Sequence, residues 1–430
     1  MHSLLTVCLL IALVALLIWN KIERHWVSLV ILLILVLTNS LSLNEIIKYV
    51  DWDVLGLIIG VSILSVYLER SGFTGLIASY IVNISRGSRL LFLLLVSFIA
   101  GLISIFMENV SVVILMFPIV ISASRIIGLN PVIPSILMAL SANISGSATM
   151  IGDPPAIITA GAFNLSFIDF IVYEGKPSMF FFTIVSMITA IIVSCYIGQR
   201  RLESIRVDNA GGESNRLFVY TIFTLEAILS LAVKIFLLSL RHSIGVSLTL
   251  TALISIGLLT LLRIVHRDLV SVRVALKRGF EWKLILFLVG VFALSGSFEK
   301  HGLAALFAEY LLRLSSRNSV LITSSLLFLS VVLSAVIDNV PITVTMIPVV
   351  VKIGELVKID PVVIMWSVLI GLTLGGNLTY IGASANLTIV RLLEKNGYRV
   401  SFIDFIKISI IYNTVSVFIA WILYLITYFM

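Results

Sequence analysis

The sequence predicts an all-α integral membrane protein built from two inverted-topology repeats, and three observations support this fold class. Of the 430 residues, 60% are hydrophobic and only 12% are charged, whereas soluble domains carry about a quarter charged residues. An offset of 230 residues superposes the halves, for example Trp52 on Trp282 and Asn109-Val110 on Asn339-Val340. Polar, glycine-rich interruptions recur at this offset, a pattern typical of secondary transporters that bind their solute between repeats.

Apolar segments of about 20 residues predict the membrane crossings. The first half contains five, the fourth of them discontinuous: Ser3 to Trp19, Trp26 to Leu43, Val54 to Leu68, Val132 to Phe163 and Pro177 to Gly198. The second half repeats the order: Leu217 to Leu240, Ile244 to Val265, Leu284 to Phe298, Val362 to Leu393 and Ile406 to Tyr428. We therefore expect about 10 transmembrane crossings, with discontinuous helices at the midplane.

Each half holds one further apolar segment, Leu90 to Ile127 and Val320 to Val351, which is too long for one helix. Glu108-Asn109 and Asp338-Asn339 interrupt these segments near the middle. We interpret each as a re-entrant helical hairpin. Because unpaired backbone within a bilayer is tolerated only where protein or a water-filled cavity covers it, both hairpin tips are expected inside the protein.

An odd number of crossings per half places the second repeat upside down relative to the first. The predicted organisation is a first repeat over 1–198, a cytoplasmic linker over 199–216 and a second repeat over 217–430. If both termini lie outside, twenty of the 29 Lys and Arg residues fall in cytoplasmic segments and eight outside. The positive-inside rule favours this orientation in a multi-pass protein of the plasma (inner) membrane.

The discontinuous crossings carry runs of small and polar residues, Ser141 to Pro155 and Gly375 to Asn386. Side-chain and unwound backbone oxygens in such runs suit sodium, and half-helix N-termini favour an anion. Alternatively, Gly and Ser mark places where membrane helices merely pack closely. The matching positions in both halves favour a binding site.

Three acids are the more specific signal, because a charge at the bilayer centre costs several kcal/mol or more. Glu108 and Asp338 occupy equivalent positions, and Asp153 adds a third carboxylate. The windows 101–120, 141–160, 331–350 and 371–390 contain no Lys or Arg, so we expect these acids to bind a cation or carry protons without a basic partner. They could instead lie in wet loops near the surface, and Asp153, before Pro154-Pro155, could be only a helix cap.

Other function classes find less support. Two buried carboxylates could form the acid–base pair of an intramembrane hydrolase, but no His-Glu-x-x-His motif occurs and the five His residues are scattered. A channel requires no inverted duplication. The basic segment Arg263 to Lys283 is interpreted as a cytoplasmic loop, because a basic patch alone is weak evidence for a nucleic-acid partner. Cys8 and Cys195 are isolated, and we expect no enzyme activity and no cofactor.

The chain resembles the ion transporter superfamily, in the branch of arsenical pump membrane proteins, the melanosomal P protein and bacterial sodium/proton antiporters, with a citrate transporter-like domain. The resemblance covers essentially the whole chain and is carried by Asp338-Asn339-Val340, the run from Gly375 to Asn386, and Ile151-Gly152-Asp153-Pro154-Pro155. It implies a fold with two re-entrant hairpins and two discontinuous helices. It also implies a homodimer embedded in membrane lipid, in which a transport domain moves against a scaffold like an elevator.

The resemblance also implies which residues bind the substrate or ion: Asn109, Asn143, Ser145, Ser147, Thr149, Asn339, Asn377, Thr379, Ser384 and Asn386. A sodium ion would lie at the asparagines of this group, Asn109, Asn143, Asn339 and Asn377, and the ion-coupling carboxylates would be Glu108, Asp338 and Asp153. The tips of related sodium/dicarboxylate symporters carry Ser-Asn-Thr motifs. The acidic tips of this chain differ, which argues against transport of a citrate-like polyanion unless protons or sodium screen it.

The expected function is secondary active transport of a small ion or anion, as in an arsenite or anion permease, with H⁺ or Na⁺ as the coupling ion. A sodium/proton antiporter and a sodium-coupled di- or tricarboxylate symporter are the alternatives within transport. The intramembrane hydrolase and the channel remain alternatives from other classes.

Overall fold

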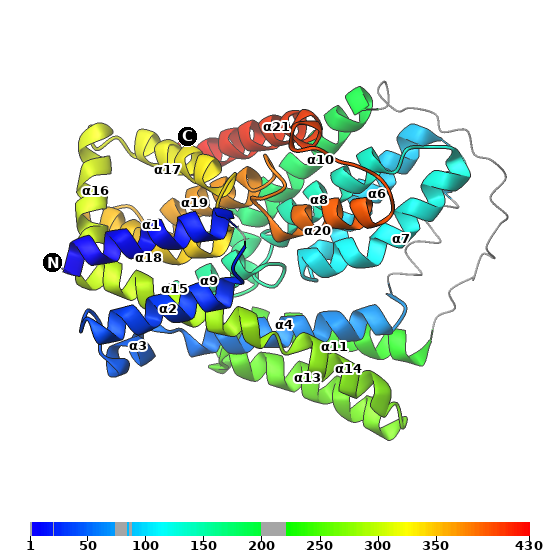
Figure 1. Cartoon of the computed structure of the whole chain (residues 1–430), viewed down its shortest axis with the longest axis horizontal. Coiled ribbons are helices and arrows are strands. Elements are labelled where there is room, and N and C mark those ends of the chain that lie inside the picture. The colour runs from blue at the N-terminus through cyan, green and yellow to red at the C-terminus, as the bar shows by residue number, and fades with distance from the viewer. Residues whose placement is uncertain (1, 20, 74–83, 86–87, 199–220) are drawn as a thin grey trace.

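The computed structural model describes residues 2–19, 21–73, 84–85, 88–198 and 221–430. The predicted linker 199–216 lies outside the described residues, so the repeat boundary stays a prediction. In the described part of the chain nearly every element is a helix (Figure 1). The exceptions are the strands β1 (Val172–Tyr173) and β2 (Lys176–Pro177), which pair antiparallel. A short 3₁₀ helix, η1 (Ile168–Phe170), precedes them.

Helices recur at the offset found in the sequence. The first repeat contains α1 (His2–Trp19), α2 (Arg24–Leu37), α3 (Leu43–Tyr49), α4 (Trp52–Arg70), α6 (Arg89–Ser104), α7 (Asn109–Ile127), α8 (Val132–Gly146), α9 (Pro154–Ala162) and α10 (Met179–Gly198). The second contains α11 (Ile222–Ser239), α12 (Arg241–Ile244), α13 (Leu248–Val265), α14 (Leu269–Gly279), α15 (Trp282–Lys300), α16 (Leu303–Leu314), α17 (Ser319–Ser334), α18 (Asn339–Val357), α19 (Pro361–Gly375), α20 (Ser384–Lys395) and α21 (Phe402–Phe429). The 230-residue offset maps both ends of α4, α6 and α7 onto the ends of α15, α17 and α18.

The two repeats have opposite orientations, as the odd number of crossings predicts. In Figure 1 the hairpin α6–α7 lies on the right and the hairpin α17–α18 on the left, so they approach the middle from opposite ends. Each hairpin packs on the broken crossing of its own repeat, α6 on α8 and α17 on α19. Each also contacts the half-helix of the other repeat, α7 with α20 and α18 with α9. The hairpins thereby bring both interruptions together.

Membrane-spanning length is the other test of the fold. Eight helical segments in the described residues are long and apolar enough to cross a bilayer, and nine if α16 and α17, bent by 119°, count as one span. The expectation of about 10 crossings includes the discontinuous ones, whose halves α8, α9, α19 and α20 are individually too short for that criterion. Both counts describe a multi-pass helical membrane protein.

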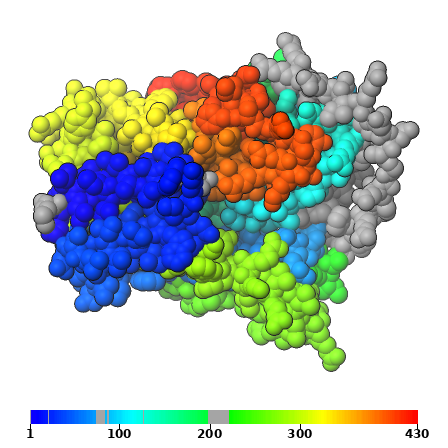
Figure 2. All heavy atoms as spheres, viewed as in Figure 1, coloured from blue at the N-terminus to red at the C-terminus, as the bar shows by residue number. Residues whose placement is uncertain are grey.

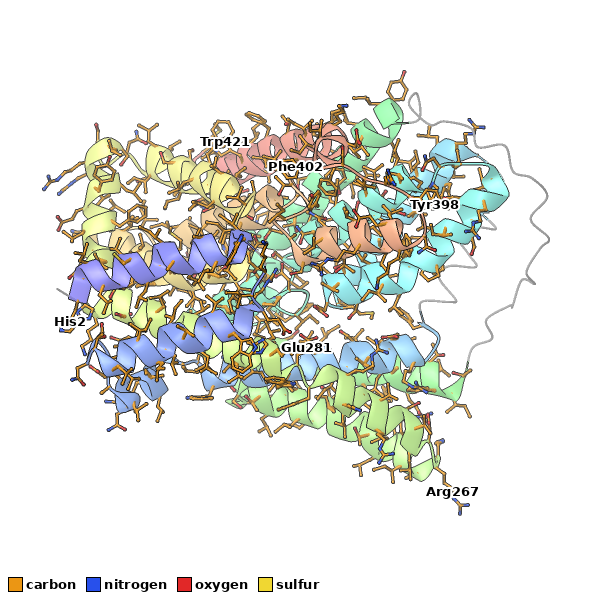
Figure 3. All side chains as sticks on the ribbon, in the orientation of Figure 1. His2, Arg267, Glu281, Tyr398, Phe402 and Trp421 are labelled. Carbon is orange, nitrogen blue, oxygen red and sulfur yellow. The ribbon has the colours of Figure 1, made fainter. Side chains whose placement is uncertain are left out.

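The third crossing of each repeat differs from its prediction. We expected one helix over Val54 to Leu68 and one over Leu284 to Phe298, but each crossing begins with a short extra helix, α3 before α4 and α14 before α15. The basic segment expected as a cytoplasmic loop therefore forms α14. A Cβ on Gly279 would lie 2.5 Å from the Ile63 Cα, so this glycine lets α14 pack closely along α4. Glu281 follows at the break and lies near the middle of the molecule (Figure 3).

A small hairpin fixes the start of α19. The Tyr173 hydroxyl in β1 donates a hydrogen bond of 2.6 Å to Asp360, which caps α19 by accepting from the Val362 N–H at 2.8 Å. The fully buried Trp366 ring packs edge-on against Phe170 and Tyr173. Buried aromatic pairs of this kind contribute about 1 kcal/mol each beyond the buried area, and this one anchors the second broken crossing to the first repeat.

Candidate substrate and ion site

Both hairpin tips and both broken crossings surround one cavity of about 560 Å³. The tips contribute Glu108 to Val110 and Asp338 to Val340, and the starts of α9 and α20 contribute Asp153 to Pro155 and Gly382 to Ala385. The remaining walls are the connection between α1 and α2 and the start of α15. Four helix interruptions that are far apart in sequence thus meet at one place inside the protein.

The structure divides the residues implied by the family resemblance into two groups. Seven line the cavity: Glu108, Asn109, Asn143, Asp153, Asp338, Asn339 and Ser384. Six lie behind its wall, where they are bonded to other parts of the protein: Ser145, Ser147, Thr149, Asn377, Thr379 and Asn386. The first group therefore faces the cavity, and the second makes hydrogen bonds within its wall.

The two tips are held by the same hydrogen bond in each repeat. The Ser104 hydroxyl at the end of α6 donates to Asn109 Oδ1 at 2.6 Å. Its repeat mate Ser334, at the end of α17, donates to Asn339 Oδ1. Each serine accordingly ties the last turn of one hairpin helix to the first residue of the next, which orients both asparagine side chains at the cavity.

Threonines from the broken crossings fasten the same tips a second time. Thr149 donates a hydrogen bond of 2.7 Å to the carbonyl oxygen of Ile105, and Thr379 donates one of 2.5 Å to that of Ala335. These carbonyls follow the ends of α6 and α17, where no intrahelical N–H is left to satisfy them. The threonine hydroxyls replace that partner and fix each tip to the adjoining break.

The repeats touch each other through an equivalent pair of contacts. Asn143 donates to Asn377 Oδ1 at 3.0 Å, and the offset maps this contact onto the hydrogen bond of 2.7 Å from Thr373 to Ser147. Asn109 extends the amide chain by donating to Asn143 Oδ1 at 3.3 Å. The two repeats thus meet through an amide pair and its symmetry-equivalent hydroxyl pair, and Asn143 of the amide pair also lines the cavity.

Asp153 caps a half-helix, as one of its two sequence interpretations states. Its Oδ1 accepts a hydrogen bond of 3.1 Å from the Ala156 N–H, and its Oδ2 accepts one of 2.7 Å from Ser147. The side chain is buried yet lines the cavity. The repeat mate of Asp153 is Ala383, which offers α20 no side-chain cap.

Asp338 has a basic partner, which corrects the expectation from the sequence windows. Arg24, the first residue of α2, forms an ion pair with Asp338 and also donates to Ser384 Oγ at 3.4 Å. Arg24 is 314 residues away in sequence from Asp338. Arg24 lies outside the sequence windows around the tips and the broken crossings. Only folding brings the connection between α1 and α2 to the second tip.

Glu108 has a different environment. It accepts a hydrogen bond of 3.1 Å from Ser111, and among the described residues it makes no ion pair. Glu281, at the break before α15, lines the same cavity and was missed by the sequence analysis. The signal that could have found it is its repeat mate Asp51, because both acids directly precede the matched residues Trp52 and Trp282.

Exposed charged side chains line the mouth of the cavity. In Figure 2, α1 and α2 (blue) lie beside α20 (orange) on the face shown. Lys21, Glu23, Lys283 and Arg391 line the mouth and are exposed. Lys283 donates a hydrogen bond of 2.5 Å to Glu23, and this bond lowers the pKa of Glu23. With Arg24, Glu108, Asp153, Glu281 and Asp338 further in, the cavity carries charges of both signs.

A protein-family comparison identifies the chain. The model of the citrate transporter family matches it twice, over residues 14–242 and 235–430. The chain belongs to the citrate transporter family. The two matches fit the two repeats of the fold, and the resemblance noted from the motifs is confirmed.

Two of the relatives compared are named as transporters. An uncharacterized transporter of Mycobacterium tuberculosis is 27% identical over 372 residues, which cover 85% of this chain and 84% of the relative. An uncharacterized transporter of Synechocystis is 26% identical over an alignment of 415 positions, gaps included, which covers 91% of each chain. The human P protein is 25% identical over an alignment of 446 positions, gaps included, which covers 86% of this chain and 52% of the P protein.

Two solved transporters share the fold. MtrF of Neisseria gonorrhoeae, described as one of a class of antimetabolite efflux pumps, aligns with a TM-score of 0.63 and 14% identity over 93% of this chain and 85% of MtrF. The YdaH transporter of Alcanivorax borkumensis aligns with a TM-score of 0.55 and 15% identity over 98% and 97%. Together with the family match and the apolar helices of the described residues, these findings identify the chain as a multi-pass membrane transporter.

Proposed function

We propose that this protein is a secondary active transporter of a small anion, coupled to H⁺ or Na⁺. The observation that carries the proposal is the meeting of both hairpin tips and both broken crossings at one cavity of mixed charge. Opposite orientations of the repeats allow such a site to open to either side of the membrane in turn. An elevator-like movement of the hairpins against the α1–α2 side fits this arrangement.

Features that favour an anion lie on several elements. Helices α7, α9, α18 and α20 all begin at cavity-lining residues, so four positive dipole ends converge there. Lys21, Arg24, Lys283 and Arg391 add positive side chains. A small oxyanion, whether arsenite-like or a carboxylate, could be held by N–H donors from both repeats.

Features that favour a coupling cation lie on the same walls. Glu108, Asp153 and Asp338 supply carboxylates, and Asn109, Asn143 and Asn339 supply amide oxygens to the cavity, all hard ligands suited to Na⁺. Asn377, proposed as a sodium ligand with them, lies one layer behind and accepts hydrogen bonds from Asn143 and Asn386. We place sodium or proton binding at this acidic side.

Transport in liposomes tests the proposal. Purified protein would be reconstituted, a sodium gradient imposed and internal pH followed, with and without citrate, arsenite or inorganic phosphate as the added anion. Anion uptake that stops when the sodium and proton gradients are abolished supports the proposal. Absence of any gradient-driven flux would contradict it and would return attention to the channel and hydrolase interpretations.

A sodium/proton antiporter is the second candidate, and the lack of an ion pair at Glu108 among the described residues favours it. Exchange of Na⁺ for H⁺ on this carboxylate needs no anion. A sodium-driven pH change in the absence of added anion, lost in Glu108→Gln but kept in the exposed control Glu355→Gln, would select the antiporter. We further propose a homodimer in the plasma membrane with both termini outside.

A further inference from the structure

One ion pair connects the α1–α2 side of the cavity to the second hairpin tip. Arg24 begins α2, a helix that packs on α1 and α15, whereas Asp338 precedes α18 and caps it by accepting from the Val340 N–H at 3.2 Å. The Arg24 side chain is 37% exposed and that of Asp338 is 14% exposed. The guanidinium is therefore reachable from the cavity while it neutralises a largely buried carboxylate.

Among the described residues, no other cation at the mouth forms an ion pair with Asp338. Lys283 is hydrogen-bonded to Glu23, and the Lys21 ammonium lies 5.3 Å from the Trp19 ring centroid. Arg391 is exposed on α20. The acids that share the cavity, Glu108 and Glu281, increase the cost of leaving Asp338 ionised without its guanidinium.

The place beside Arg24 can also receive an external anion. Arg24 donates to Ser384 Oγ at 3.4 Å, at the first residue of α20, whose preceding residue Ala383 supplies no side-chain cap. In the first repeat the equivalent position is filled by Asp153. A carboxylate or phosphate oxygen bound at Arg24 would contact the uncapped N–H groups of α20. At the equivalent position of the first repeat, the Asp153 carboxylate caps α9.

We propose that Arg24 binds either Asp338 or the transported anion, and that this exchange couples anion binding to uptake of H⁺ or Na⁺ by Asp338. One guanidinium cannot neutralise two carboxylates in a partly buried site, because an unpaired charge there is strongly unfavourable. When the anion occupies Arg24, Asp338 must therefore be protonated or bind sodium. The inference rests on the proposed function and assigns its coupling step to a named pair.

Binding to the purified full-length protein in detergent tests the exchange without transport. Calorimetry would measure citrate and inorganic phosphate as probes at alkaline pH without sodium, and again after adding sodium or lowering the pH. For the wild type we expect binding only in the second condition. Asp338→Asn should bind the probe in both conditions, with at least about a tenfold gain, or about 1.4 kcal/mol, at alkaline pH.

Variants of Arg24 give the opposite result. Arg24→Gln should lose probe binding in both conditions, and Arg24→Lys should retain it weakly because a point charge remains without the planar fork. Arg313→Gln, an exposed basic residue in the last turn of α16, is the matched control and should bind as the wild type does. Size-exclusion profiles and melting temperatures would establish that each variant is folded.

Two results would overturn the exchange. One is equal probe binding by the wild type and Arg24→Gln. The other is that neither the wild type nor Asp338→Asn binds citrate or inorganic phosphate in any condition. Sodium-driven pH changes in liposomes would show separately whether the protein is still a cation-coupled transporter, so failure of the exchange and failure of the proposed function are distinguishable.

Discussion

The two halves of the site share their framework but differ in their charges. Both tips are held by the same serine-to-asparagine bond and the same threonine-to-carbonyl bond. In contrast, Asp338 is paired with Arg24, whereas Glu108 makes no ion pair among the described residues. The two repeats thus share the hydrogen bonds that shape the cavity. They differ in the charged side chains that line it.

The strongest test of the shared framework uses a matched pair of crowded glycines, one in each broken crossing. A Cβ on Gly152 would overlap the carbonyl oxygens of Gly146 and Ser104, and one on Gly382 would overlap those of Gly376 and Ser334. Gly152→Ala and Gly382→Ala should each lower the liposome transport rate at least about 100-fold, because displacing a tip by about 1 Å can cost that much. A large loss in only one of them would break the equivalence of the two halves.

A second glycine pair should separate the halves. A Cβ on Gly146 would overlap the Asn109 side chain, but a Cβ on Gly376 would lie 3.3 Å from Asn339 Oδ1 and 3.1 Å from Ser334 Oγ. Gly146→Ala should therefore reduce the transport rate about tenfold more than Gly376→Ala, since the first forces its asparagine to move much farther than the second does. Equal rates for the two variants would contradict this difference in packing.

The charge difference can be reduced by giving α20 the cap that α9 has. Ala383 has an extended backbone, with φ of −139° and ψ of 139°, close to that of Asp153. Ala383→Asp should stabilise the protein by about 1 kcal/mol as an N-cap, seen as a higher melting temperature, while weakening probe-anion binding. Ala383→Asn, a neutral cap, is the control and should stabilise without weakening binding; weakening in both variants would implicate size rather than charge.

The smallest expected effect concerns the threonines that fasten the tips. Thr149→Val and Thr379→Val each leave a backbone carbonyl, that of Ile105 or Ala335, without its hydrogen bond. Thr379→Val also removes the acceptor of the Ile381 and Gly382 N–H groups. Each variant should lower the free energy of unfolding by about 1–3 kcal/mol, and the loss should be larger for Thr379→Val. Thermal melts followed by tryptophan fluorescence would measure both; Thr388→Val, which removes only a solvent-exposed hydroxyl bond within α20, serves as the control and should change little.

Much of the fold follows from local sequence properties. Apolar length predicted α1, α10 and α21 to within a few residues, and the acidic pairs Glu108-Asn109 and Asp338-Asn339 marked both hairpin tips. The repeat offset showed the duplication, and the odd number of crossings per half then predicted the opposed orientation of the halves. The short helices α3 and α14 were missed, because each is short and less apolar than a full span and α14 carries the basic residues expected of a loop.

The sequence by itself determined that the chain spans a membrane, that it is duplicated, and which segments are broken, because these depend on apolar length and periodic similarity along the chain. Only the tertiary structure decided which charges meet: Arg24 with Asp338, and Glu281 beside Glu108 in one cavity. The physical reason is that ion pairing depends on distance in space. Residues 314 apart in sequence become neighbours only when the inverted repeats pack together.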